Sequence, residues 1–214
     1  MTDISWLFQF GARSMAIPLL LLLGLLHCHA LRVPPSAVDG ARISYFAYGA
    51  NLATSVREGR RRLRPISTKP GFVRDERLAF NLPGFSLLEP AFASITPATG
   101  QECHGGVFEL SAGDWVKVCA SEGVPFAYRV REVPVELYTG EIVRAWTLSA
   151  GALCSPIDIP PSERYLSLIR LGAQELGLTR AWQEKISKIP TGPLSSPGVK
   201  VSEPFERRDG ATFI

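Results

Sequence analysis

Two short stretches of the sequence contain residues that could do chemistry. The first is the turn Tyr48-Gly49-Ala50-Asn51, which follows a strand-like stretch and precedes a helix-like one. A glycine at such a point lets the backbone approach a ligand closely, and the successive N–H groups that lead into a helix can hold an anion or a carbonyl oxygen. A tight strand-to-helix turn without a ligand has the same sequence, so the turn alone leaves both interpretations open.

The second stretch contains Glu122, at the C-terminal end of a helix that the sequence opens at Ser111. Residues 111–114 (SAGD) are typical of a helix N-terminus, and Gly123 is typical of a helix exit. A carboxylate at that end faces the negative end of the helix dipole, at a cost of roughly 0.3–1 kcal/mol. If the side chain is also partly buried, we expect its pKa to rise toward neutrality, which suits a group that takes up and returns a proton. A solvated Ser-Glu-Gly turn is the alternative.

Other catalytic patterns are absent from the sequence. It contains no GxSxG, no HExxH and no phosphate-binding loop, and His104 is the only histidine after residue 30. Cys103, Cys119 and Cys154 form no CxxC pair, and we expect buried or half-buried thiols. We therefore expect neither a metal nor a cofactor, so that carboxyl, hydroxyl and backbone groups must do any chemistry.

The charge of the chain gives no indication of a nucleic-acid partner. The formal net charge is +3 over 214 residues, far from the strongly basic balance of nucleic-acid-binding domains. One basic run stands out, and no aromatic residue interrupts it: Arg57, Arg60, Arg61, Arg62 and Arg64. We interpret this run as a solvated helix face rather than an anion site.

The N-terminus predicts a leader. Residues 16–26 (AIPLLLLLGLL) follow Arg13 and precede small residues at alternate positions up to Ala30, which is the layout of a secretory signal and its cleavage site. The apolar run is shorter than the roughly 20 residues that span a bilayer. We predict that residues 1–30 are a signal peptide for the secretory pathway or an organelle. The alternatives are an uncleaved membrane anchor, a buried core helix, or a non-functional leader on a cytoplasmic protein.

Residues 42–190 predict one α+β domain, with a Pro-rich linker at 31–41 and a loose tail at 191–214. We expect strands near residues 42–48, 77–81, 91–95, 105–110, 128–138 and 142–148. We expect helices over 52–63, from 111 to about 123, from 162 to 177 and from 179 to 190. Because helices do not regularly separate the strands, the sheet should be mixed or mostly antiparallel rather than doubly wound.

The same residues resemble the γ-glutamylcyclotransferase family, over most of residues 42–190. The segment Tyr45–Leu52, YFAYGANL, is similar to the family's YFAYGSNL substrate loop, and residues 75–80 (DERLAF) resemble the strand that follows it. Glu122-Gly123-Val124 resembles the EGV motif that contains the catalytic glutamate. Residues 162–190 resemble the closing helices, and they favour the original family over its glutathione-specific and γ-glutamylamine branches.

The resemblance implies a fold, a reaction and a set of site residues. The fold would be a small, mixed, mostly antiparallel β-barrel with flanking helices. The enzyme would convert small γ-glutamyl amino acids or peptides to 5-oxoproline and the free amino acid, by attack of the substrate's own α-amine and without a cofactor. The resemblance makes Glu122 the catalytic proton carrier. It assigns substrate binding to the loop and to a helical tyrosine: Tyr45, Phe46, Ala47, Tyr48, Gly49, Ala50 and Tyr165.

Two departures from the family pattern stand out. Ala50 replaces a serine found in many members, which removes a hydroxyl but keeps the backbone N–H groups. The spacing from Glu122 to Tyr128 is about one residue shorter than in familiar members, which leaves the role of Tyr128 open. Glu89 lies outside the matched motifs and should serve as a neutral control for Glu122.

Other functions remain compatible with the sequence. A non-catalytic binding module of the same fold is one alternative, and a γ-glutamyl acyl-transfer enzyme that uses a different amine is another. The sequence also leaves a homodimer open.

Overall fold

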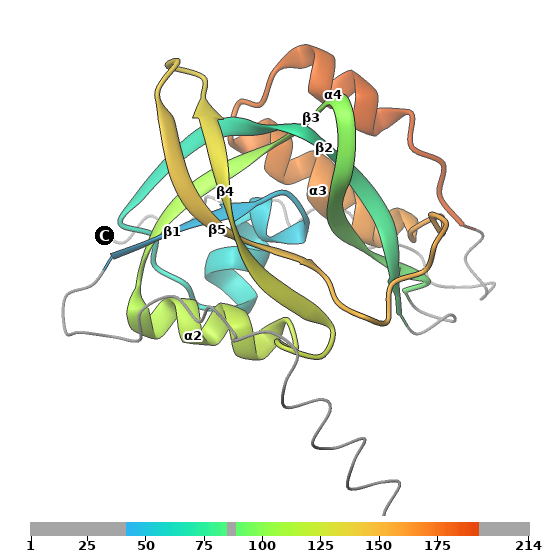
Figure 1. Cartoon of the computed structure of the whole chain (residues 1–214), viewed down its shortest axis with the longest axis horizontal. Helices are drawn as coiled ribbons and strands as arrows, with labels where there is room; N and C mark the ends of the chain where they lie inside the picture. The colour runs from blue at the N-terminus through green and yellow to red at the C-terminus, as the bar shows by residue number, and fades with distance from the viewer. Residues whose placement is uncertain (1–41, 85–88, 193–214) are drawn as a thin grey trace, which may run out of the picture. The chain divides into compact units, whose positions relative to one another are not determined.

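The structure, a computed structural model, describes residues 42–84 and 89–192. In this part of the chain the strands form a closed barrel in the order β1-β3-β2-β4-β5 (Figure 1). Neighbouring strands are antiparallel except for β1 and β5, which pair in parallel at Tyr45 and Trp146. The strands are β1 (Arg42–Ala47), β2 (Ser67–Pro83), β3 (Ala91–Ser111), β4 (Tyr128–Leu137) and β5 (Ile142–Ala150). The prediction of a mixed, mostly antiparallel barrel with flanking helices is confirmed.

The long strands β2 and β3 form a ribbon that curves round the barrel. They pair from Ser67 with Glu109 to Pro83 with Ala91, where the sequence predicted only three short strands. The register shifts between Arg74 and Glu76 and again between Ala79 and Leu82. Such irregularities bend a strand without ending it, so the breaks predicted from Pro and Gly are bends within continuous strands.

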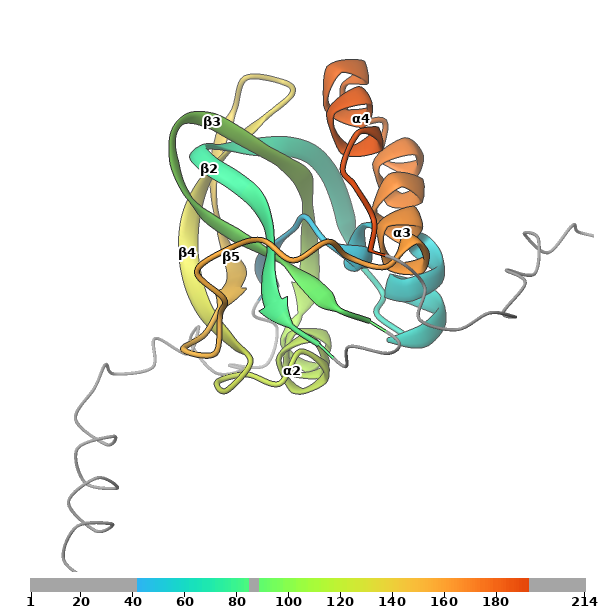
Figure 2. The same ribbon diagram turned by 90° about the vertical axis from the view of Figure 1, so that its right-hand side faces the viewer.

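Three α-helices lie outside the barrel in the described residues: α2 (Ala112–Ser121), α3 (Glu163–Glu175) and α4 (Arg180–Ser187). Each begins where the sequence predicted, because the hydroxyls of Ser111, Ser162 and Thr179 accept hydrogen bonds from backbone N–H groups of the first turn. Such a cap is worth about 1 kcal/mol. Figure 2 shows α3 and α4 together along one side of the barrel, with α2 apart from them.

The helix predicted over 52–63 is wrong in type. The chain instead forms a 3₁₀-helix η1 (Ala50–Leu52) and a π-helix η2 (Ser55–Arg60). The Arg57 guanidinium turns inward, donates to the carbonyl of Leu52 at 2.7 Å and lies 4.5 Å from the centre of the Phe108 ring. In an α-helix that carbonyl would accept a backbone N–H, so the buried side chain replaces a regular helical bond.

The predicted leader at 1–30, the linker at 31–41 and the tail beyond residue 192 lie outside the described residues. Among residues 42–84 and 89–192, no helix has both the length and the apolar character needed to cross a bilayer.

Close packing at Gly172 joins α3 to the turn after β1. A Cβ added at Gly172 would lie 2.4 Å from the backbone N of Ala53 and 2.4 Å from the carbonyl carbon of Leu52. Both atoms belong to the backbone and cannot rotate away. Glycine is therefore what lets α3 support this turn from behind.

Replacing Gly172 with Ala should lower the free energy of unfolding by about 1–3 kcal/mol, the usual cost of forcing extra atoms into a packed site. Urea unfolding measures the change. Gly59→Ala is the matched control, since nothing lies within 4 Å of its added Cβ, and its stability should be unchanged or slightly higher. Equal stability of the two variants would contradict the close contact.

Candidate active site

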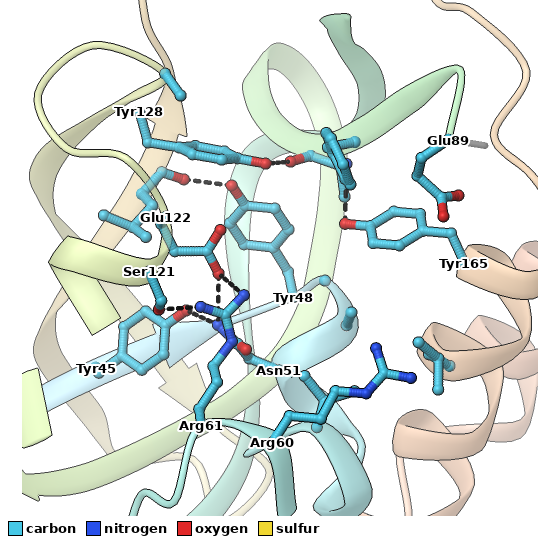
Figure 3. A pocket seen from close by; sticks show the side chains of 18 of the residues that line it. Tyr45, Tyr48, Asn51, Arg60, Arg61, Glu89, Ser121, Glu122, Tyr128 and Tyr165 are labelled. Atoms are coloured by element: carbon cyan, nitrogen blue, oxygen red, sulfur yellow. Dashed lines mark hydrogen bonds and ion pairs between the residues drawn. The ribbon is translucent and has the colours of Figure 1, made fainter. Parts of the chain in front are cut away.

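A pocket of about 420 Å³ opens among the turn after β1, the end of α2 and the first turns of α3 (Figure 3). Glu122 lies in it, together with five of the seven residues predicted to bind substrate: Tyr45, Tyr48, Gly49, Ala50 and Tyr165. Phe46 and Ala47 do not line the pocket. They are 0% and 1% exposed, they lie opposite Val107 and Gly106 of β3, and the carbonyl of Phe46 accepts a hydrogen bond from the hydroxyl of Thr147.

Glu122 stands at the C-terminal end of α2, as predicted. Its backbone N–H donates to the carbonyl of Val118, and Gly123, with φ +66°, turns the chain out of the helix. The carboxyl group points into the pocket and its side chain is 17% exposed. Its Oε1 lies 3.0 Å from Nδ2 of Asn51 and 2.7 Å from Nη2 of Arg61. Both contacts use Oε1, which leaves Oε2 for a ligand.

Burial raises the pKa of Glu122, while the Arg61 guanidinium and the Asn51 amide act in the opposite direction. The expectation of a raised pKa at this helix end is confirmed. Burial also raises the pKa of the half-buried Cys119 thiol to about 11 and raises the pKa of Tyr45 strongly. Those neighbours therefore stay neutral while the carboxyl group titrates, and Glu122 is the group here suited to exchanging a proton.

Asn51 belongs to the site, although the sequence analysis assigned it to the turn without predicting a role for its side chain. Its Nδ2 donates to the hydroxyl of Tyr45 and to Glu122, each at 3.0 Å, and the residue is 5% exposed. Its Oδ1 has no hydrogen-bond partner in the described part of the chain. The side chain thus ties the turn to the carboxyl group and keeps one buried acceptor beside the pocket. Its place in the YGAN turn was the signal that could have identified it.

The interpretation of the basic run as a solvated face is wrong for two of its members. Arg57 is buried beneath the turn, and the Arg61 side chain is only 20% exposed and pairs with Glu122. Arg60 is exposed and lines the pocket, whereas Arg62 and Arg64 are exposed outside it. The segment at the end of η2 therefore gives the pocket a positive edge.

Two tyrosines from different elements meet at Ala93 of β3. The hydroxyl of Tyr165, on α3, accepts from the backbone N–H of Ala93 at 3.1 Å, and the hydroxyl of Tyr128, on β4, donates to its carbonyl at 2.7 Å. Both side chains line the pocket. Tyr128 therefore has a structural role in fixing the pocket wall.

Glu89 also belongs to this pocket, contrary to its expected use as a neutral control. It is 4% exposed, and its carboxylate accepts from the hydroxyl of Ser162 and pairs with Arg164. A substitution there would disturb the N-terminus of α3. A control carboxylate must come from elsewhere.

The expected thiols are partly as predicted. Cys103 is buried and Cys119 half-buried, but Cys154 is exposed, so the prediction is wrong for Cys154. No group of three or more His, Cys, Asp or Glu residues in the described ranges could hold a metal ion.

Comparison with known proteins places the chain in a family. No protein-family model matches the sequence. The human protein named Gamma-glutamylcyclotransferase is 31% identical to it over 177 residues, which cover 78% of this chain and 88% of the human one. The chain belongs to the γ-glutamylcyclotransferase family. A solved structure named Gamma-glutamyl cyclotransferase superposes with a TM-score of 0.64 at 28% identity, covering 76% of this chain and 95% of the other.

A fungal relative is also similar. Gamma-glutamyl cyclotransferase gliK of Claviceps purpurea is 27% identical over 147 residues, or 65% of this chain. The match covers 66% of the fungal protein, just under two thirds of its length.

Replacing Glu122 with Gln should change how stability depends on pH. A carboxyl group whose pKa is raised on folding stabilises the fold fully below its unfolded-state pKa and loses that contribution as pH rises through the folded-state pKa. Gln has no proton to lose. Relative to wild type, the variant should therefore gain stability as pH rises above about 4.3, the ordinary pKa of a glutamate, and through the raised folded-state pKa.

Urea unfolding of both proteins across this range measures the difference. A difference that does not vary with pH, or that moves in favour of wild type, would show that the Glu122 pKa is not raised.

Proposed function

We propose that this chain is an active γ-glutamylcyclotransferase, which converts γ-glutamyl amino acids or peptides to 5-oxoproline and the released amino acid or peptide. The observation that carries the proposal is Glu122. It is a largely buried carboxyl group with a raised pKa, it projects into a pocket beside a Tyr-Gly-Ala-Asn turn, and the chain belongs to the family of this name.

The first step is transfer of a proton from the substrate's α-ammonium to Glu122. An α-amine has an ordinary pKa of about 8, far above that of an exposed glutamate. A raised carboxyl pKa narrows this gap and makes the transfer less unfavourable. Oε2 of Glu122 is the acceptor, because Oε1 is held by Asn51 and Arg61.

The second step is ring closure. The α-amine attacks the γ-carbonyl and forms the C–N bond of a five-membered ring. The bond to the leaving nitrogen breaks as that nitrogen takes the proton from Glu122. The ring nitrogen then loses its second proton to the Glu122 carboxylate, which passes it to the released amine, so that the products are the lactam and an ammonium group. Because nucleophile and electrophile belong to one molecule, positioning supplies much of the acceleration; effective molarities in such reactions reach roughly 10⁵–10⁸ M. The pocket has only to hold the chain of the glutamyl group in a bent form.

The turn after β1 stabilises the oxygen that becomes negative during ring closure. The backbone N–H groups of Gly49 and Ala50 stand at the start of η1, where the first N–H groups of a helix have no partner within it. Hydrogen-bond donors that already point toward a developing charge stabilise the transition state by several kcal/mol in a site that excludes water. This role uses the backbone alone, so Ala50 serves as well as serine.

Incubation of the purified chain with γ-glutamyl-alanine should release 5-oxoproline and alanine. Glu122→Gln keeps the size of the side chain but cannot carry a proton, so kcat should fall by roughly 10²–10⁴-fold while substrate still binds. Glu122→Asp withdraws the carboxyl group by one methylene and should also be strongly impaired.

Glu141→Gln is the control, since Glu141 is an exposed carboxylate in the β4–β5 turn, 3.6 Å from Lys69. Near-normal turnover by Glu122→Gln would rule out Glu122 as the proton carrier. Transfer of the glutamyl group to an added amine, with no 5-oxoproline formed, would favour the acyl-transfer alternative.

We also propose that residues 1–30 are a cleaved leader, which the apolar run at 16–26 and the small residues before Ala30 support. Expression of the full chain in eukaryotic cells, followed by N-terminal sequencing, should give a mature protein that begins near Leu31. Recovery of a membrane-bound protein that retains residues 1–30 would support the anchor instead, and recovery of the intact chain from the cytosol would contradict both.

A further inference from the structure

Arg61 forms an ion pair with Glu122. Neither the substrate loop nor the EGV motif implies any role for this arginine. The 2.7 Å contact joins η2 to the end of α2, two elements that are separate in the sequence and border the same pocket. Both side chains are largely buried, at 20% and 17% exposed. An ion pair at this depth is screened less by solvent than one on the surface.

The backbone around Arg61 explains why this arginine, and not its neighbours, reaches Glu122. Arg61 follows the last residue of the π-helix η2, and its N–H donates to the carbonyl of Val56 at 3.0 Å. Arg62 then adopts a left-handed conformation with φ 53°, uncommon for a residue other than glycine, and the chain turns away. Single π-helical turns occur frequently at functional sites. Here the wide turn directs Arg61 inward and leaves Arg62 exposed.

A second contact holds the guanidinium in place. Nη1 of Arg61 donates to the hydroxyl of Ser121, the last residue of α2, and that hydroxyl donates to the carbonyl of Val118 at 3.0 Å. The cation therefore lies at the C-terminal end of α2, where the helix dipole favours positive charge. It opposes both features that would otherwise keep Glu122 protonated, namely the negative helix end and burial.

Arg61 is the one cation among the titratable groups that interact electrostatically with Glu122 in the described residues. The others face it from β1, the turn, α2, β4 and α3: Tyr45, Tyr48, Cys119, Tyr128 and Tyr165. Burial raises the pKa of each of these groups, so they are neutral over the range in which a carboxyl group titrates. Control of the Glu122 charge therefore falls to Arg61 and, more weakly, to the Asn51 amide.

We propose that Arg61 is a positioning residue for the proposed reaction, which favours the ionised form of Glu122 and holds its Oε1 so that Oε2 faces the incoming substrate. The inference rests on the proposed cyclotransferase activity. Without Arg61, Glu122 would be protonated over a wider pH range and could not accept the proton of the α-ammonium. The guanidinium acts through Glu122 and takes no part in bond making.

The test is the pH dependence of kcat/KM for 5-oxoproline release by the full chain. In Arg61→Gln the acid limb should move toward higher pH by about one unit or more, because an opposite charge this close favours the ionised carboxyl by about that amount. Arg61→Lys keeps the positive charge, so the acid limb of its pH profile should lie close to that of wild type. Ser121→Ala removes the anchor of Arg61 and should shift the limb less, in the same direction.

Arg62→Gln is the matched control, since it removes the same charge from an exposed neighbour that makes no contact with the pocket, and its profile should match wild type. An unmoved limb in Arg61→Gln would overturn the proposal. So would a rise in KM alone, which would mean that Arg61 binds the substrate's carboxylate instead. A wild-type chain that releases no 5-oxoproline would overturn the proposed function and this inference with it, whereas an active wild type with an unmoved limb would overturn only the inference.

Discussion

Burying the Glu122 carboxyl group costs free energy, because a carboxylate loses hydration and at this position also faces the negative end of α2. Neighbouring groups in the site offset part of that cost. Arg61 supplies an opposite charge and Asn51 a hydrogen bond, and both contact the same carboxylate oxygen. Burial outweighs these two contacts, so the pKa stays raised. A carboxyl group balanced in this way can bind and release a proton without leaving its place.

The barrel and its helices hold the groups around Glu122 in fixed positions. The turn after β1 is supported from behind by α3, where Gly172 allows contact at backbone distance. Beside the turn, Ala93 of β3 is hydrogen-bonded through its N–H to Tyr165 and through its carbonyl to Tyr128. Functional side chains held by packed elements keep their geometry better than those on free loops. Most groups that touch the pocket therefore also hold the fold together, which is why Glu89 could not serve as an inert control.

Local signals made part of this structure predictable. The caps at Ser111, Ser162 and Thr179 depend on residues three positions apart, so the sequence alone located the starts of the helices. The position of Glu122 followed from one of these helices, and the family loop identified the turn beside it. The continuous course of β2 and β3 was not predictable in the same way, because their bends depend on pairing with the partner strand.

The inward orientation of Arg61 also could not be predicted from the sequence. Arg60, Arg61 and Arg62 are chemically identical, and only the π-turn and the left-handed residue after it decide which one faces inward. Phe46 is the opposite case, a residue predicted to bind substrate that does not line the pocket. It belongs to the family motif, yet the motif does not reveal that its side chain fills the core while its neighbours Tyr45 and Tyr48 line the pocket.

The ionisation of Glu122 in the free protein tests this account most directly. Carbon-13 NMR of the chain labelled at the glutamate carboxyl carbons would follow each carboxyl group through a pH titration, and Glu122→Gln would identify the Glu122 signal by its loss. The account predicts a midpoint above the value of about 4.3 that an unperturbed glutamate shows. A midpoint at or below that value would mean that Arg61 and Asn51 outweigh burial, and Glu122 would then be a fixed carboxylate unsuited to carrying a proton.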